Sequence, residues 1–429
     1  MWLTQVVFYG LPWLQWGARQ AVQFDLEARR FYVFGLVLYP QDFIYLTALL
    51  VISALALFLF TAVAGRLWCG FACPQTVYTE LFVWIERRVE GDRGARLRLD
   101  AAPWTAAKAG RKALKHGLWL LLALWTGYTF VGYFEPVRAL GAQLLTGTAR
   151  AWTMFWVLFY ALATYGNAGF LREQVCKYMC PYARFQGAMF DKGTLIVSYD
   201  TQRGEPRGSR PRGADGQARG LGSCTDCTLC VQVCPVGIDI RKGLQYECIS
   251  CGLCIDACDG IMKKMRYATG LIRFTTQAAL AGGMAGSGLR NGLLRPRVMA
   301  YLTLLLALVA ALASALALRM PLKVDVVRDR SVLARQVSGG AVENVYRLQV
   351  MNATESRQRY RIVAEGLPGL HVASEQEFEV GPVESRWVGV RVQLPVDVIA
   401  AGSHPMKFVV STAQADSGVT EKSVFLVPR

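Results

Sequence analysis

Long apolar runs constrain this chain more than any other feature of its sequence. Residues 43–64 contain no charged side chain, and about 20 apolar residues are enough for a helix to cross a bilayer. Residues 114–134, 151–170 and 298–318 form comparable runs flanked by arginine or lysine. Because 53% of the 429 residues are apolar, these runs exclude a purely soluble globule and predict a multi-pass membrane protein.

The start of the chain forms a shorter apolar run. Residues 1–16 are rich in aromatic side chains but lack the basic region and the small-residue cleavage site of a signal peptide. We therefore expect a first span at about residues 1–16 that is cut short at its N-terminal end. The alternative is a helix that lies in the membrane interface.

The basic excess of the chain predicts its orientation. The formal net charge is +16, and the basic residues are concentrated in 61–115 and 171–297, whereas 17–42 and 135–150 contain few. This asymmetry follows the positive-inside rule, so it indicates membrane topology and not a nucleic-acid partner. We expect a multi-pass protein of the bacterial cytoplasmic (inner) membrane, with 65–113 and 171–297 cytoplasmic and the C-terminal residues on the periplasmic side, surrounded by membrane lipid.

The last part of the chain has the pattern of a β domain. After residue 319 short alternating apolar runs are separated by glycine, proline, asparagine and serine, which is typical of an antiparallel β-sandwich. We expect an immunoglobulin-like domain over 320–429, with Trp387 in its core. Residues 199–223 have almost no large apolar side chain and are predicted to be a flexible linker, and residues 269–297 a connector to the last span.

Cysteine spacing gives the strongest chemical signal. The chain has 12 cysteines, none after Cys258, and two runs of four share the spacing of bacterial ferredoxins, in which three close thiolates hold one 4Fe–4S cluster and the fourth ligates the other. The predicted ligands within a domain over 224–268 are Cys224, Cys227, Cys230 and Cys258 for one cluster and Cys248, Cys251, Cys254 and Cys234 for its partner. A zinc site is the alternative, but zinc has no use for a third and fourth cysteine in each run.

The remaining cysteines form a second repeat. Cys69 and Cys73 in WCGFACP, and Cys176 and Cys180 in VCKYMCP, each follow a predicted span at its cytoplasmic end. Either the proline begins a new helix, or the span continues and the i,i+4 spacing places both sulfurs on one face. If the two pairs meet, four soft sulfurs suit Cu(I), a zinc ion or a disulfide redox cycle. The alternative is that these cysteines are packed between helices without binding metal.

Several motifs together resemble one known family. They include RRFYVFGLVLYPQD at 29–42, GRLWCGFACPQTVYTE at 65–80, CKYMCPYARFQ at 176–186, YDTQRGEPRG at 199–208 and CVQVCPVGIDIRKGLQYECISCGLCIDACDG at 230–260. With these motifs the chain resembles the FixG, RdxA and CcoG family of membrane iron–sulfur proteins, which are accessory factors of cbb3-type cytochrome c oxidase. The resemblance extends over nearly the whole chain.

The resemblance implies an architecture and an activity. It implies a helical membrane bundle with an inserted ferredoxin-like domain that carries two 4Fe–4S clusters, followed by a periplasmic immunoglobulin-like domain. It also implies an oxidoreductase that reduces Cu(II) to Cu(I) for delivery to the oxidase, with copper as substrate or transiently bound ion. The implied partners are oxidase subunits or copper chaperones and an unidentified electron donor. Cys69, Cys73, Cys176 and Cys180 are the proposed catalytic, copper-facing set.

Two other functions remain open from the sequence. The chain also resembles membrane polyferredoxins of quinol dehydrogenases, which would pass electrons from quinol to a partner without copper turnover. A third possibility is a non-redox assembly scaffold, in which the clusters are structural and the outer domain docks an oxidase subunit.

Overall fold

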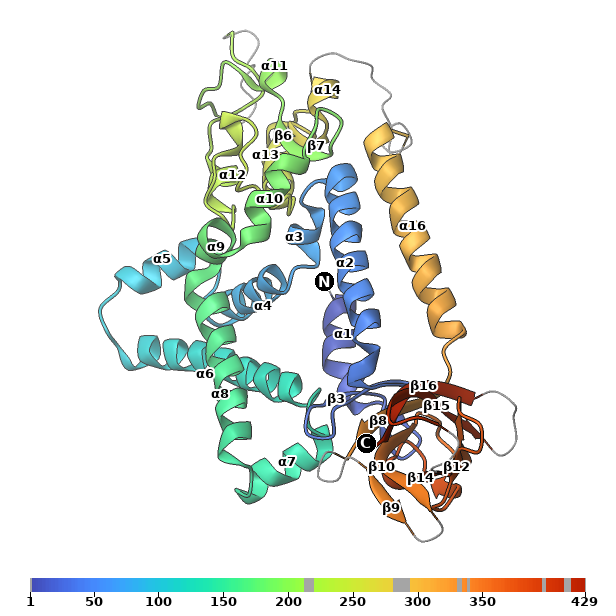
Figure 1. Cartoon of the computed structure of the whole chain (residues 1–429). Helices are drawn as coiled ribbons and strands as arrows, with labels where there is room; N and C mark the ends of the chain where they lie inside the picture. Colours follow the sequence, from blue (N-terminus) through green and yellow to red (C-terminus); the bar gives the residue numbers. More distant parts are fainter. Residues whose placement is uncertain are drawn as a thin grey trace. The chain divides into compact units, whose positions relative to one another are not determined.

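The computed structural model describes residues 2–211, 220–280, 294–329, 334–337, 340–395, 399–412 and 418–428. The chain divides into two compact units. The first comprises Met1–Gln15 and Phe43–Ala313, and the second comprises Trp16–Asp42 and Ser314–Arg429. Figure 1 labels most of the α-helices and many of the strands of both units.

The first unit contains the helices and the cysteine-rich segment. Its elements are α1 (Trp2–Gly10), η1 (Leu11–Trp13), α2 (Phe43–Ala64), α3 (Leu67–Phe71), α4 (Pro74–Val89), α5 (Arg93–Ala101), α6 (Ala106–Val131), α7 (Val137–Thr146), α8 (Ala151–Gly166), η3 (Asn167–Leu171), α9 (Arg172–Gln174), η4 (Val175–Met179), α10 (Pro181–Met189), β6 (Ile196–Tyr199), α11 (Thr201–Gly204), α12 (Leu229–Gln232), η6 (Ile240–Lys242), α13 (Leu253–Met265), β7 (Ile272–Thr275), α14 (Gln277–Leu280) and α16 (Pro296–Ala317).

Three helical segments among the described residues are long and apolar enough to cross a membrane: Pro40–Ala64, Ala151–Met179 and Pro296–Ala317. The second of them is longer than the expected 151–170, because two π-helical turns, η3 and η4, carry the helix on to Met179. The other two expected spans look different. Helix α1 has only 9 residues, and α6 starts with a basic half before its apolar part, so their crossing of the membrane stays a prediction.

Close packing fixes the helix that follows the first cysteine pair. The indole of Trp119 in α6 donates a hydrogen bond to the backbone oxygen of Phe82 in α4 at 3.1 Å, and the two rings stack with centroids 5.0 Å apart. Glu86 at the other end of α4 pairs with Arg172 at 2.9 Å. Helix α4 is therefore held against both α6 and α9, which positions Cys73 at its first turn.

A two-stranded sheet closes the base of the cysteine-rich segment. Strands β6 and β7 pair antiparallel, with Val197 opposite Phe274 and Tyr199 opposite Ile272. Val197, Tyr199 and Ile272 are at most 4% exposed and pack in the same apolar cluster as the cysteines. The segments that enter and leave the ferredoxin runs are thus tied together.

The segment 199–223 is packed where the structure describes it, unlike the flexible linker expected from its composition. Arg203 donates to the backbone oxygen of Thr269 at 2.9 Å. Arg210 is 9% exposed and donates to the Tyr267 hydroxyl at 3.0 Å and to the backbone oxygen of Gly222 at 2.6 Å. Composition misled here because the arginines act as internal hydrogen-bond donors and not as solvated charges. Residues 212–219 of this segment, and residues 281–293 of the expected connector, lie outside the described residues.

The second unit contains a β-sandwich. One sheet has the order β12-β14-β10-β8 with β9 paired to β10, and the other has the order β13-β11-β15-β16. The strands are β8 (Leu322–Arg328), β9 (Arg335–Val337), β10 (Ala341–Asn352), β11 (Gln358–Glu365), β12 (His371–Val372), β13 (Glu377–Val380), β14 (Ser385–Pro395), β15 (Gly402–Thr412) and β16 (Gly418–Val427). Inward side chains from both sheets, such as Tyr346 and Phe408, form one core. The predicted immunoglobulin-like sandwich is confirmed.

The prediction for Trp387 was wrong. Its side chain is 47% exposed and lies under the guanidinium of Arg347, with 5.2 Å between the guanidinium carbon and the ring. The reason is the period of two along β14: Val388 and Val390 face the core, so the residue before them faces outward.

A buried carboxylate lies within the first sheet of the sandwich. Glu343 has a 1% exposed side chain that pairs with Arg335 and accepts a hydrogen bond from Gln393 at 2.6 Å. Burial raises the pKa of Glu343, but the hydrogen bonds from Gln393 and Arg335 outweigh it, so the pKa lies below its usual value. This carboxylate therefore stays charged throughout the neutral range.

The segment between the first two helices belongs to the second unit and is not merely a connection. It contains β1 (Gln15–Trp16), β2 (Arg19–Gln20), β3 (Val22–Asp25), β4 (Arg30–Val33) and β5 (Leu36–Leu38), and the last three form an antiparallel sheet. Tyr32, Val37 and Tyr39 pack with Met351 and Ala353 of the sandwich. The sequence held a signal for this small sheet, because short apolar runs rich in aromatic residues and valine lie on both sides of the Phe34-Gly35 turn.

An ion-pair cluster joins the two parts of this unit. The carboxylate of Asp42 is 1% exposed and pairs with Arg319 and, at 3.2 Å, with Lys323. The same carboxylate accepts the backbone N–H of Tyr39 at 3.1 Å. The residue that precedes α2 is thus bound to the residues that follow α16.

Candidate metal centres

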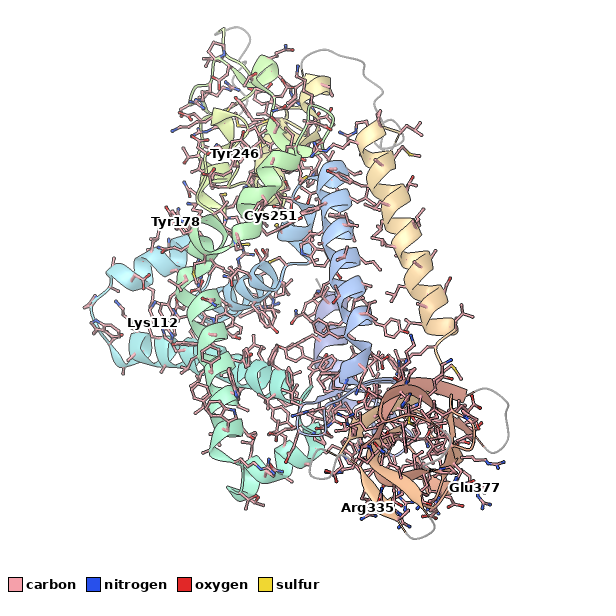
Figure 2. The ribbon with its side chains drawn as sticks, in the orientation of Figure 1. Lys112, Tyr178, Tyr246, Cys251, Arg335 and Glu377 are labelled. Carbon is pink, nitrogen blue, oxygen red and sulfur yellow. The ribbon has the colours of Figure 1, made fainter. Side chains whose placement is uncertain are left out.

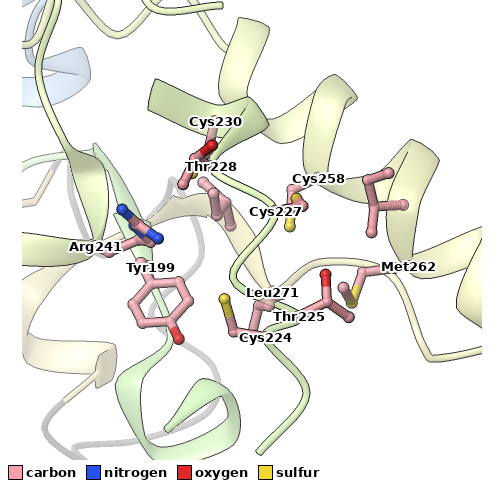
Figure 3. A pocket seen from close by; sticks show the side chains of 12 residues that line it. Tyr199, Cys224, Thr225, Cys227, Thr228, Cys230, Arg241, Cys258, Met262 and Leu271 are labelled. Carbon is pink, nitrogen blue, oxygen red and sulfur yellow. The ribbon is translucent and has the colours of Figure 1, made fainter. Parts of the chain in front are cut away.

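The first candidate centre is a hollow surrounded by one predicted set of four cysteines. Figure 3 shows Cys224, Cys227, Cys230 and Cys258 around it, with Arg241 and Tyr199 on one side. Asp226 and Thr228 have left-handed backbone conformations, with φ of 50° and 56°, which bend the chain around the hollow. Cys230 comes from α12 and Cys258 from α13. The fourth thiol therefore comes from the other cysteine run.

The second candidate centre repeats this arrangement with the other set. Its lining includes Cys234, Cys248, Cys251 and Cys254. The chain bends at Ser250 and Gly252, with φ of 54° and 80°, so that the cysteines of this run turn inward. The exchange of the last cysteine between the two runs is the arrangement that the ferredoxin spacing predicts.

The hollows fit the predicted clusters through their cysteines. Each hollow has about 350 Å³ of space, partly open to solvent, and is lined by four cysteines with ferredoxin spacing. Burial raises the pKa of Cys251 to about 11 and that of Cys258 to about 12, so these thiols need a bound metal to become thiolates at neutral pH. The residues present therefore suit iron–sulfur clusters.

The two hollows differ in the polar residues among their lining. Tyr199, Thr225, Thr228 and Arg241 line the first together with apolar Ile261, Met262, Leu271 and Ile272, whereas the second is lined, besides its cysteines and Gly252, by Val236, Ile238, Ile240, Ile249 and Pro235. Arg241 is held by Asp239 at 2.8 Å. Cys227 of the first set is exposed. Since charge, hydrogen bonding and solvent exposure set the potential of such clusters, we expect the two to differ in potential.

The two remaining cysteine pairs adopt the same local structure. Cys73 and Cys180 each directly precede the proline at the first position of a helix, α4 and α10. The amide of Cys73 donates to the oxygen of Trp68 at 2.9 Å, and the amide of Cys180 donates to the oxygen of Val175 at 2.8 Å. Of the two geometries left open by the sequence, the proline begins a new helix in both motifs. The preceding span continues through Cys176 in the second motif alone.

The structure brings these two motifs together. The thiol of Cys69 donates to Oε1 of Gln186 in α10 at 3.4 Å, and it interacts electrostatically with Cys73 and Cys180. Cys176 interacts likewise with the other three cysteines. Burial raises the pKa of Cys69 to about 11. The two motifs therefore approach each other, although no three of these cysteines are close enough here to hold one ion.

The first cysteine pair also touches the second hollow. A Cβ atom at Gly70 would lie 2.7 Å from the backbone oxygen of Ile249 and 3.0 Å from Cα of Cys251, a residue labelled in Figure 2. Cys69 and Cys176 pack against the same apolar cluster as Cys248 and Cys251. The glycine in WCGFACP therefore permits direct contact between the thiol motif and the loop that carries the second cluster.

Comparisons with known proteins agree with this construction. Family models for a 4Fe–4S dicluster domain match residues 171–277, for a 4Fe–4S binding domain residues 46–90, and for the Ig-like fold at the C-terminus of FixG residues 312–428. Nitrogen fixation protein FixG of Rhizobium meliloti is 39% identical, over 86% of this chain and 76% of its own length. Protein RdxA of Cereibacter sphaeroides is 40% identical, over 87% of this chain and 81% of its own length.

A more distant relative matches about half of this chain. The ferredoxin-type protein NapH of Haemophilus influenzae is 26% identical, over 49% of this chain and 66% of its own length. Together, the fold and the cysteine sites define a membrane iron–sulfur protein of electron transfer with an immunoglobulin-like C-terminal domain. Within that class, the chain belongs to the FixG family, as its sequence motifs had suggested.

Several residues of the centres escaped the sequence analysis. Arg241 and Tyr199 line the first hollow, Gln186 receives the Cys69 thiol, and Arg66 is buried beside the cysteines. Gln186 and Arg66 lie within the family motifs, but no spacing rule assigns a partner to an isolated glutamine or arginine.

Proposed function

We propose that this protein reduces Cu(II) to Cu(I) in the assembly of a cbb3-type oxidase, with Cys69, Cys73, Cys176 and Cys180 as the copper-binding set. The observation that carries the proposal is the contact of this thiol set with the loop of the second hollow at Gly70. Clusters held by the eight ferredoxin cysteines supply single electrons, and soft thiolates favour Cu(I) over Cu(II). Each electron delivered converts one Cu(II) to one Cu(I).

The chain's own residues give this transfer a direction. The first hollow has an exposed cysteine, Cys227, and a charged residue, Arg241, in its lining, which suits entry of electrons from a soluble donor. The second hollow has apolar walls and adjoins the thiol set, which suits exit to copper. The proline after Cys73 and Cys180 begins a helix in both motifs, so both thiols lie at the start of a helix.

The proposed location is the cytoplasmic membrane of a bacterium, with the ferredoxin part inside and the sandwich in the periplasm. The distribution of basic residues supports this orientation. The grouping of residues 16–42 with 314–429 in one unit supports it too, because both segments then lie on one side. Copper chaperones or oxidase subunits are the proposed partners.

A copper-reduction assay tests the proposal. Anaerobic protein with reduced clusters, freed of reductant, is mixed with Cu(II), and Cu(I) is measured with a chromogenic chelator. Serine at all four positions of the thiol set should slow Cu(I) formation at least about tenfold while the cluster spectra stay intact. Met320→Leu, which removes an exposed sulfur in the other unit, is the control and should react like the wild type. Unchanged reduction in the serine variant would remove these cysteines from the mechanism.

The similarity to the ferredoxin-type protein NapH favours one other candidate, an electron carrier without copper turnover, such as the quinol-dependent carrier considered from the sequence. A quinol analogue would then reduce the clusters without copper, and added Cu(II) would not reoxidise them. A non-redox scaffold is distinguished by a potentiometric titration, because its clusters would not be reduced reversibly at physiological potentials.

A further inference from the structure

Arg66 is a buried cation at the junction of two redox sites. It lies between α2 and α3 and is only 3% exposed. One guanidinium nitrogen donates to the backbone oxygen of Ala183 in α10, the helix that follows the second cysteine motif, but its Nε has no hydrogen-bond partner among the described residues. A buried guanidinium with an unused donor is costly unless an anion lies nearby.

The backbone leaves Arg66 little choice of position. Gly65 before it has a φ of +58°, and a Cβ there would lie 2.3 Å from the backbone oxygen of Leu195. The amide of Leu195 in turn donates to the oxygen of Val63 at 3.2 Å. The turn that ends α2 therefore packs against Leu195, the residue directly before β6, which directs Arg66 into the interior.

The groups that interact electrostatically with Arg66 are cysteines of both redox sites and Glu247. Burial lowers the pKa of Arg66, while Cys69, Cys248, Glu247 and Cys176 act in the opposite direction. Glu247 is exposed, and no carboxylate forms an ion pair with Arg66 among the described residues. Cys248 is a ligand of the second hollow, so iron binding there would leave a thiolate and a cluster of net negative charge beside this guanidinium.

We propose that Arg66 is a positioning residue that acts as the fixed counter-cation of the second cluster and raises its reduction potential. Reduction adds one negative charge to the cluster, and a buried positive charge beside Cys248 stabilises that state. Arg241 has the same relation to the first hollow, which it lines. Each of the two guanidinium groups therefore interacts with a different cluster. This inference does not depend on copper, so it stands or falls separately from the proposed function.

Potentiometric titration followed by EPR of the full-length protein, without copper, tests the proposal. Arg66→Gln should lower the potential of the second cluster and leave that of the first unchanged, whereas Arg241→Gln should do the reverse. Arg66→Lys keeps the charge and should restore most of the wild-type potential. An Arg66→Gln protein that retains both clusters but shows no shift in the second would overturn the proposal.

A second measurement covers loss of the cluster. If Arg66→Gln lowers the iron and sulfide content, Arg66→Lys should keep both, because the lysine supplies the charge without the planar fork. Equal loss in the lysine and glutamine variants would mean that the hydrogen bond to Ala183 is the whole contribution of Arg66, and this too would overturn the proposal. Failure of copper reduction by the wild type would leave these outcomes unaffected.

Discussion

The buried ion pairs of Asp42 allow one prediction with a defined magnitude. Asp42→Asn keeps the size of the side chain and an oxygen that accepts the Tyr39 amide, but it removes the charge opposite Arg319, whose side chain is only 7% exposed. Loss of one partner of a buried pair costs about 3–5 kcal/mol because the other charge stays buried. Lys323, at 30% exposure, can turn to solvent and adds little to this cost.

Hydrogen exchange of the full-length protein measures this loss. At about 1.4 kcal/mol per tenfold, backbone amides of β4 and β5 should exchange roughly a hundred to several thousand times faster in Asp42→Asn. The control is Glu377→Gln, which breaks an exposed pair with Arg359 at 3.0 Å and should change exchange less than about threefold. Replacing Arg319 by methionine in the Asp42→Asn background should recover much of the protection. Equal exchange in Asp42→Asn and the control would refute the reasoning.

Three further outcomes are expected. Cys258→Ser should lose the EPR signal of the first cluster and Cys234→Ser should lose that of the second, and each variant should lose about half of its iron. The opposite pairing would disprove the exchange of ligands between the two cysteine runs. Because the folded-state pKa of Glu343 is depressed, the stability that its charge contributes is present above pH about 4.5 and is lost as the pH falls through the folded-state pKa. Glu343→Gln should therefore flatten the acid side of a plot of the sandwich's unfolding temperature against pH. An unaltered acid slope would contradict this. Gly70→Ala should lower occupancy of the second cluster because its Cβ would lie 2.7 Å from a backbone oxygen, whereas Gly117→Ala, with open space around it, should retain full iron content.

Residue spacing within short segments predicted the parts of this molecule whose structure depends mainly on that spacing. The spacing of eight cysteines anticipated both hollows, including the exchange of Cys234 and Cys258, because cluster geometry leaves few ways to enclose iron. Alternation likewise predicted the sandwich, since its strands each face one core. Strict use of the same period would have placed Trp387 on the outer face.

Contacts between distant segments were out of reach of the sequence. The packing of residues 16–42 on the sandwich joins positions separated by most of the chain. The meeting of Cys69 with Gln186, and the burial of Arg66, depend on how two helix ends approach each other. Arginine-rich composition predicted solvent exposure for Arg210, yet its donors are used internally. In each case tertiary packing supplied a contact partner that neither composition nor residue spacing indicates.

The small sheet β3-β4-β5 has a practical consequence for work on the C-terminal domain. Met351 and Ala353 are covered in the whole protein by residues from the beginning of the chain. A fragment that begins after the last helix would therefore expose an apolar surface that is covered in the intact protein. Self-association of this fragment, or its binding to other proteins, would not represent the intact molecule. A fusion that restores the N-terminal hairpins through a short tether would give a more faithful reagent.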